Sequence, residues 1–443
     1  MTNGINNTLM GWNAGYGMTS GNNNIGIGSK ALFTNASGDV NTAIGMSALF
    51  NNTSGSRNVA IGGGAMDGNT TGSQNVAVGF AALNANETAN GLVAIGDSSL
   101  FNNIGDSNTA IGHKSMYSNV AGETNTAVGD EAMYLNVDGH CNSVLGYKAL
   151  FSNVQGINNT AIGCGALQSS TGSYNTAVGT SALDSNTSGG SNTALGYAAL
   201  PLNRTGFQNI AVGDNTLTKN ESGSGNIGIG SQALFTNEAG IRNIAVGYHA
   251  LWYLDGKDRT IAIGDSAMFS SVGTPGQEMR STAVGSFALK NNTTGYSNTA
   301  IGYNALNNNI TGIRLTAIGT GADVSNSNLQ NASAIGFNAS VSTSNTMSFG
   351  NTNTEEWVFG ISTAGASRAL EVGSSASNGN GAYLTTGGTW TNTSNYDKKE
   401  DFSDIEGATL LEKIETLPVQ HWKYKGTEEY HIGPYAQDFN KIV

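Results

Sequence analysis

The sequence predicts an all-β fold, a parallel β-solenoid (β-roll) of about 20 coils, with a small α+β segment at its C-terminal end. Three observations lead to this fold. A motif of 17 residues recurs from near the N-terminus to about residue 340. Within it, short apolar stretches alternate with Gly, Asn and Ser, which favours strands and corners over helices. Charged residues make up only 11% of the chain, against about 25% in ordinary globular proteins.

The repeat is visible in NTAIGMSALFNNTSGSR, residues 41–57, which two near copies follow directly. We take the glycine that ends Ala-Ile-Gly, or its variants, as the marker of one coil. Successive markers lie 17 residues apart, except for two intervals of 16 and one of 21. The marker glycines are Gly11, Gly28, Gly45, Gly62, Gly79, Gly96, Gly112, Gly129, Gly146, Gly163, Gly179, Gly196, Gly213, Gly230, Gly247, Gly264, Gly285, Gly302, Gly319 and Gly336.

Each coil is expected to hold two short strands. One strand ends at the marker, with Ala two residues before it and Ile, Val or Leu one residue before it, as in Ala43 and Ile44. The other strand carries Ala-Leu, with Leu or Met four residues after the marker, as in Leu49, Met66 and Leu83. In a stacked solenoid these equivalent residues are vertical neighbours, and we expect the Ile and Leu columns to form the core.

Asparagine and glycine columns mark the corners. Asn recurs seven residues after the marker and four residues before it, as in Asn52 and Asn58. Identical amides stacked above one another can hydrogen-bond along the stack, and Asn tolerates left-handed backbone at corners. Gly recurs ten residues after the marker, as in Gly55, where we expect a positive φ.

The stacked coils would form a thin rod. With a spacing of about 4.8 Å between coils, the rod would be roughly 95 Å long. One Ile and one Leu per coil bury little apolar area against the entropy lost on folding. Columns of Ala would let another chain approach closely. We therefore expect a homotrimer in which three such faces pack together.

An aromatic side chain often stands five residues after the marker. Strand alternation would turn this column outward, away from the inward Leu. It would serve either as an interface between chains or as a surface that contacts a glycan, and the sequence leaves both open. The predicted binding residues are Phe33, Phe50, Phe101, Tyr117, Tyr134 and Phe151.

The coil at residues 265–285 is four residues longer than the usual 17 and contains Pro275. Insertions in solenoids form loops on one face, often the binding face. We expect either a specialised loop here or a neutral bulge.

Composition and spacing argue against several functions. The net charge of −12 and the lack of a basic cluster argue against nucleic-acid binding. The sequence contains no run of 18 apolar residues that would suggest membrane insertion. Residues 1–15 lack the basic and apolar regions of a signal peptide. The two cysteines, Cys141 and Cys164, and the five histidines share no ligand spacing, so we expect no metal and no cofactor.

Three segments are expected along the chain. Residues 1–340 form the solenoid shaft or head. Residues 341–393 read as strands with Gly, Ser and Asn turns, a β neck and linker that would end the coil stack and protect its last edge. Residues 394–443 form a separate segment, because composition shifts there: residues 395–443 hold 16 of the chain's 50 charged residues.

The repeats NTAIGMSAL and NTAVGTSAL resemble those of trimeric autotransporter head domains and, still more, arrays in phage-type tail fibres. Over about residues 5–340 this resemblance implies a left-handed, trimeric roll. The C-terminal segment resembles the start of the S74-type intramolecular chaperone of tail spikes and fibres, without that family's long trimeric helices. The matching residues are Trp390, Ser394, Lys399, Glu400, Leu410, Leu411, Leu417, Trp422, Tyr424, Gly433, Ala436, Gln437 and Asp438.

In that family a Ser and a Lys form a self-cleaving dyad, in which the Lys deprotonates the hydroxyl. By position these residues are Ser394 and Lys399, although Asn395 stands where the family has Asp. The resemblance implies at most one self-cleavage event per chain. The alternative is a chaperone-like or capping module that does not cut.

These features favour a structural fibre protein, the shaft or adhesive part of a trimeric tail fibre of a phage or phage-like injection system that attaches to a cell surface. The expected partners are further copies of the chain, baseplate or other fibre proteins, and a receptor or glycan. The expected location is the virion tail or the cell exterior. The alternative is a secreted bacterial adhesin or extracellular matrix filament. An ice-binding solenoid would need an outward Thr-x-Thr grid, which the strands lack.

Overall fold

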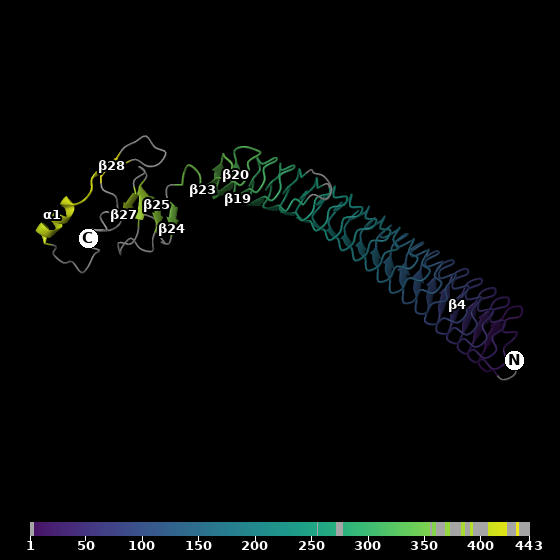
Figure 1. Cartoon of the computed structure of the whole chain (residues 1–443). Helices are drawn as coiled ribbons and strands as arrows, with labels where there is room; N and C mark the ends of the chain where they lie inside the picture. Colours follow the sequence, from purple (N-terminus) through teal and green to yellow (C-terminus); the bar gives the residue numbers. More distant parts are fainter. Residues whose placement is uncertain are drawn as a thin grey trace. The chain divides into compact units, whose positions relative to one another are not determined.

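The computed structural model describes residues 4–254, 256–271, 278–354, 357–359, 368–372, 382–385, 390–392, 406–422 and 431–433. The chain divides into two compact units, residues 1–351 and 352–443. The first unit is a parallel β-solenoid, which confirms the fold predicted from the repeat (Figure 1).

Successive coils of the solenoid place one short strand each in a single 21-stranded sheet. The pairing is parallel and shifts by one repeat, so that Thr42 lies beside Val59 and Val59 beside Val76. Two further strands, β20 (Asp323–Val324) and β22 (Ser340–Val341), pair with each other near the end of the stack. The strands of the large sheet are β1 Thr8–Met10, β2 Ile25–Ile27, β3 Thr42–Ile44, β4 Val59–Ile61, β5 Val76–Val78, β6 Val93–Ile95, β7 Thr109–Ile111, β8 Thr126–Val128, β9 Ser143–Leu145, β10 Thr160–Ile162, β11 Thr176–Val178, β12 Thr193–Leu195, β13 Ile210–Val212, β14 Ile227–Ile229, β15 Ile244–Val246, β16 Ile261–Ile263, β17 Thr282–Val284, β18 Thr299–Ile301, β19 Thr316–Ile318, β21 Ser333–Ile335 and β23 Met347–Phe349.

The second unit contains a four-stranded sheet and a short helix. The sheet is formed by β24 (Trp357–Phe359), β25 (Arg368–Val372), β26 (Ala382–Thr385) and β27 (Trp390–Asn392). Helix α1 (Gly407–Glu415) is followed by β28 (Gln420–Trp422) and β29 (His431–Gly433), which pair antiparallel. No helix in the described part of the chain is long and apolar enough to cross a membrane.

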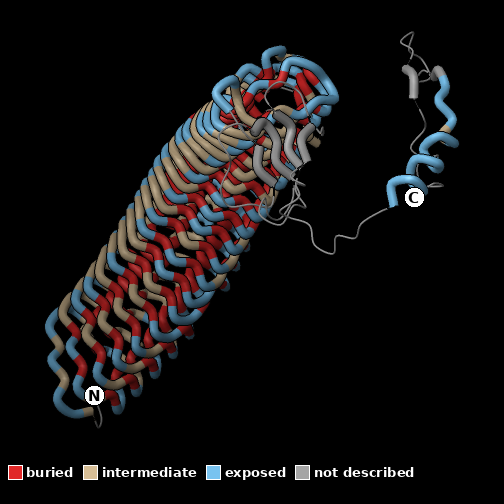
Figure 2. Tube along the Cα trace, turned by 90° about the vertical axis from the view of Figure 1, so that its left-hand side faces the viewer, coloured by how far each residue is buried: buried red, intermediate tan, exposed pale blue. Residues whose placement is uncertain are grey.

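The core of the solenoid consists of Ala and Leu columns, not of Ile and Leu. Ala43, Ala48 and Leu49 are fully buried, whereas Ile44 is 36% exposed. In a strand of three residues only the middle side chain points inward, and that residue is the Ala. The buried columns run along the rod as continuous stripes (Figure 2). The Ala columns therefore lie inside the coil, and the expectation that they admit a second chain is wrong.

Vertical stacking of Leu49, Met66 and Leu83 is confirmed, but the segment that carries them is not the second strand that was expected. All three are fully buried, and the Leu49 N–H donates to the Ala65 carbonyl of the next coil at 3.0 Å. Their backbone is left-handed, with φ of 52° at Leu49.

Alternate residues of this return side are left-handed, and this arrangement lets each coil bond to both of its neighbours. Ser47, with φ of 57°, donates its N–H to Ser29 in the preceding coil at 2.9 Å, whereas Leu49 donates to the following coil. A left-handed L-residue costs about 1–2 kcal/mol. The strain persists because buried backbone groups must be paired.

Glycines occupy two points of a typical coil, for different reasons, although Ala89, Lys257 and Leu329 replace the second one in their coils. The marker Gly45 has a φ of 137°, which L side chains rarely adopt. Gly55 is not left-handed, so the φ predicted for its column is wrong. A Cβ at Gly55 would instead collide with the carbonyl of Gly72 in the next coil and with Asn52 Oδ1. Close approach of the stacked corners therefore excludes a side chain there.

The predicted asparagine ladders are confirmed. Asn52 Nδ2 donates to Asn35 Oδ1 at 2.7 Å and to the Gly55 carbonyl at 2.9 Å, and Asn52 Oδ1 accepts from Asn69 Nδ2 at 2.8 Å. In the second column the Asn58 N–H donates to the Oδ1 of an Asn one coil earlier at 3.0 Å. These ladder residues are not left-handed, although Asn tolerates that conformation at corners.

The neighbours Asn52 and Asn51 allow a matched test of the ladder. Asn52 is fully buried and Asn51 is exposed. We expect Asn52→Ala to destabilise its coils by about 2 kcal/mol, because it leaves buried donors and acceptors unpaired. Asn51→Ala should change stability by less than about 0.5 kcal/mol. Native-state hydrogen exchange of residues 35–75 measures both, and equal protection in the two variants would contradict a stabilising ladder.

Candidate functional site

The outer surface of the large sheet is an uncharged band with one apolar column. The first and third side chains of each strand point outward, and we call these two columns the sheet face. The third residue is Ile, Val, Leu or Met in each of strands β1–β19. Leu145, Leu195 and Ile162 are 51%, 47% and 39% exposed. The first residue is Thr, Ser, Val or Ile, so no residue of the sheet face in these strands carries a charge.

The residues that directly follow the marker glycines form a second exposed column beside the sheet face. We call it the bordering column. Several of its members are large and exposed, including Trp12 at 66%, Phe80 at 66% and Tyr197 at 60%. Others are charged, such as Asp97 and Asp130. The sheet face is therefore bordered by an exposed column of mixed polarity.

The six predicted binding residues fall into two stacks of rings. Phe33 lies between Tyr16 and Phe50, with centroids 5.3 and 4.9 Å away. Phe101, Tyr117, Tyr134 and Phe151 form the second stack, at 5.1, 5.3 and 5.2 Å. Sequence reasoning missed Tyr16, although it stands in the same column. A further stack joins Phe235, Trp252 and Phe269.

Stacking changes what these aromatic residues can contact. Each inner ring, such as Phe33 or Tyr117, is half-buried and has both faces covered by neighbouring rings. A sugar that stacks on an aromatic side chain needs a free ring face. Inside a stack only the ring edges are accessible, so the geometry favours packing along the rod, which stacked rings stabilise by about 0.5–1.5 kcal/mol per pair beyond the area they bury.

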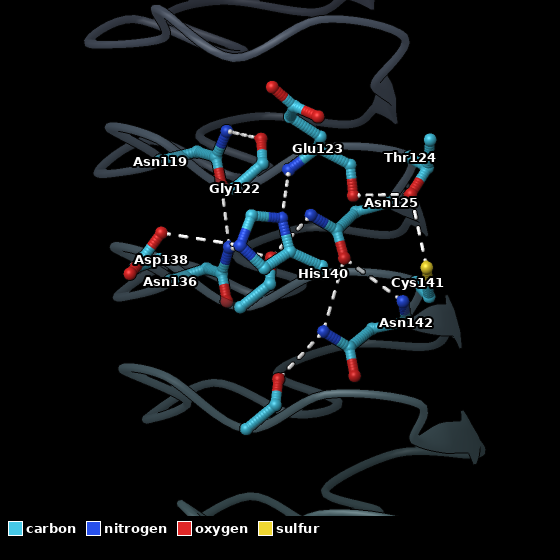
Figure 3. A network of polar contacts seen from close by, with 12 residues as sticks. Asn119, Gly122, Glu123, Thr124, Asn125, Asn136, Asp138, His140, Cys141 and Asn142 are labelled. Carbon is cyan, nitrogen blue, oxygen red and sulfur yellow. Dashed lines mark hydrogen bonds and ion pairs between the residues drawn. The ribbon is translucent and has the colours of Figure 1, made fainter.

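The scattered polar residues serve the stack as well (Figure 3). His140 Nδ1 accepts the Glu123 N–H of the preceding coil at 3.0 Å, and Nε2 lies 3.3 Å from Asp138 Oδ1. Cys141 Sγ lies 3.2 Å from Thr124 Oγ1, again one coil away. The part of the chain that the structure describes contains no group of three or more His, Cys, Asp or Glu that could hold a metal ion.

The ladders are interrupted around the long coil. Leu254 and Ser271 replace two consecutive asparagines of the first column. Asn237 Oδ1 is buried and has no hydrogen-bond partner, because the next coil presents Leu254 in place of an amide donor. The insertion itself, residues 272–277, lies outside the described residues.

Lys257 fills this interruption. Its side chain is 1% exposed, and Nζ donates to the Thr293 carbonyl at 2.7 Å, two coils further along. Burial lowers the pKa of Lys257 from 10.5 to about 8. Elsewhere the stacked amides supply the hydrogen-bond donors between coils. Here one ammonium supplies such a donor, and its bond spans the long coil.

The structure describes part of the second unit but neither residue of the predicted dyad. Helix α1, β28 and β29 are described, whereas Ser394 and Lys399 lie outside the described residues. Residues 394–443 match the family Peptidase_S74, described as chaperone of endosialidase. No curated protein matches the chain.

The match and the solenoid together fit a phage tail fibre-type structural protein with an S74 chaperone segment, as the sequence predicted. S74 segments are associated with trimeric fibre proteins, and the family points to a phage tail or an extracellular protein.

The buried ammonium predicts a pH-dependent stability. Between the folded pKa of about 8 and the unfolded value of 10.5, the unfolded chain binds more protons at Lys257 than the folded chain does. Stability should therefore rise with pH across this window. We expect Lys257→Met to remove this rise, whereas the exposed Lys219→Met keeps it. Melting temperatures at pH 7.5, 9 and 10 test this, and parallel curves for the wild type and Lys257→Met would contradict it.

Proposed function

We propose that the chain is the shaft or adhesive part of a homotrimeric tail fibre of a phage or phage-like injection system, and that it attaches to a cell surface. The observation that carries the proposal is the S74 match over residues 394–443 in a chain whose first unit is a long solenoid. Each coil bonds to both neighbours through backbone and amide groups. Such a stack is stiff along its axis, as a shaft must be.

The solenoid gives a physical reason for a chaperone segment. Its coils are nearly interchangeable, so three chains displaced by one 17-residue repeat would still make most of their contacts. Weakly specified register leads to slipped assemblies. A segment that first brings the three chain ends together removes this ambiguity before the solenoids associate. We assign this role to residues 394–443.

Assembly of the purified chain tests the proposal. We expect light scattering to give three times the chain mass of 45.4 kDa. A chain ending at residue 393 should yield slipped or aggregated species, because nothing aligns its ends. A monomeric full chain would contradict the fibre. A trimer of normal mass from the shortened chain would remove the role assigned to residues 394–443.

The location of the protein distinguishes the proposed tail fibre from the alternative, a secreted adhesin. Antibodies against the full chain should label the tails of purified phage or injection particles in electron micrographs. Labelling of bacterial envelopes or of extracellular filaments, with unlabelled tails, would instead support the adhesin.

We further propose that the C-terminal segment acts without cutting the chain. Asn395 replaces the Asp that follows the serine in the family, and this change removes a carboxylate beside the predicted dyad. The intact mass of freshly purified protein should therefore be 45.4 kDa, the same within error for Ser394→Ala. A wild-type fragment that ends at residue 393, absent from Ser394→Ala and from Lys399→Met, would establish self-cleavage.

A further inference from the structure

We propose that the sheet face is the surface through which three copies of this chain pack around a common axis, in parallel and in register. This inference rests on the homotrimer proposed above and specifies its interface. The sequence predicted the Ile column inside the coil and the Ala columns between chains, whereas in the structure the Ala columns are buried inside the coil and the Ile column is partly exposed.

The size of the sheet face argues for a protein partner. Strands of three residues stacked 21 deep cover about 1,000 Å² at ordinary strand spacing. Its third-residue column is apolar in every one of strands β1–β19, and soluble monomers rarely expose contiguous apolar patches larger than a few hundred Å². A stable interface buries about 800 Å² on each partner. The sheet face therefore has the area of an interface before the bordering column is counted.

The chemistry of the sheet face points to a second copy as the partner. The band extends along the whole stack, so its partner must be a rod of the same length. It carries no charge in strands β1–β19, so identical faces meet without like-charge repulsion. In a parallel arrangement each rung meets its own equivalents, and the C-terminal segments lie at the same end. The exposed aromatic residues of the bordering column, such as Trp12 and Tyr197, then lie at the rim.

The other surfaces suit a three-fold axis less well. The corner on the far side of the ladders carries exposed acidic residues, among them Glu87, Glu123, Glu221 and Glu238. Three copies meeting there would bring carboxylates together at many levels, which raises the energy of the charged forms. The aromatic stacks already cover their own ring faces. The sheet face is the long surface that combines exposure with a lack of charge.

Cross-linking of the full-length chain tests the assignment. In a Cys141→Ser, Cys164→Ser background, Ile162→Cys places a thiol on the sheet face and Leu202→Cys places one on the return side. The two native side chains are similarly exposed, at 39% and 43%. With a short bismaleimide we expect covalent dimers in high yield from Ile162→Cys, because each thiol reacts once, and single chains from Leu202→Cys.

A pair of double variants provides a second measurement. Ile162→Glu with Leu195→Glu would put three carboxylates together at each of two rungs near the axis. We expect this variant to lose the trimer or to melt at least about 5 °C lower than the wild type. Val154→Glu with Leu202→Glu, at residues 41% and 43% exposed in the native chain, should melt within about 2 °C of the wild type.

The outcomes separate this inference from the proposed function. A trimer that cross-links through Leu202→Cys but not Ile162→Cys, or that melts equally in the two double variants, would overturn the sheet face as the trimer interface. The proposed function as a fibre would still stand. A full-length monomer overturns both. A monomer that binds phosphatidylcholine vesicles, and loses binding in the Ile162→Glu, Leu195→Glu variant, would instead identify a lipid surface as the occupant.

Discussion

The solenoid depends on hydrogen bonds that run along the stack from each coil to the next. Its apolar core is thin, since a typical coil buries little more than two Ala and one Leu or Met. Buried asparagines occupy the rest of the interior. Burying an amide costs free energy unless it is hydrogen-bonded, so each asparagine needs a partner in the coil above or below. Asn52 meets this condition on both sides, as acceptor and as donor. Stability is therefore a property of neighbouring rungs, not of a single coil.

The exceptions follow the same rule. Asn153 and Asn237 have buried Oδ1 atoms without a partner, and in each case the next residue of the column is not asparagine but Ser170 or Leu254. One missing amide thus leaves a defect on the rung before it. Around the long coil two such gaps follow each other, and there the chain buries an ammonium. Lys257 pairs with a carbonyl and has a lowered pKa, so this interruption is tolerated rather than optimal.

The period of the sequence was sufficient to predict the solenoid, its parallel register and its amide ladders, because each needs only that equivalent residues stack. It was not sufficient to predict which side chains of a strand point into the coil. Ala43 and Ile44 are both apolar, and which of them points inward depends on strand length. The left-handed backbone at Leu49 follows from bonding between coils, which residue types alone do not show. The aromatic column is visible in the sequence, but the stacking of its rings follows from the spacing of the coils in the structure.

The same repetition that makes the rod stable deprives it of an internal marker for register. In the third column of the sheet face Ile or Val stands at most levels, so a shift of one rung between chains would lose few contacts besides the terminal ones. The interruption at Leu254 and Lys257, a distinctive feature of the stack, is buried inside the coil and does not lie on this face. In the proposed trimer, register would therefore have to be set outside the repeats. The segment to which we assign this role, residues 394–443, matches a chaperone family and has a non-repeating sequence.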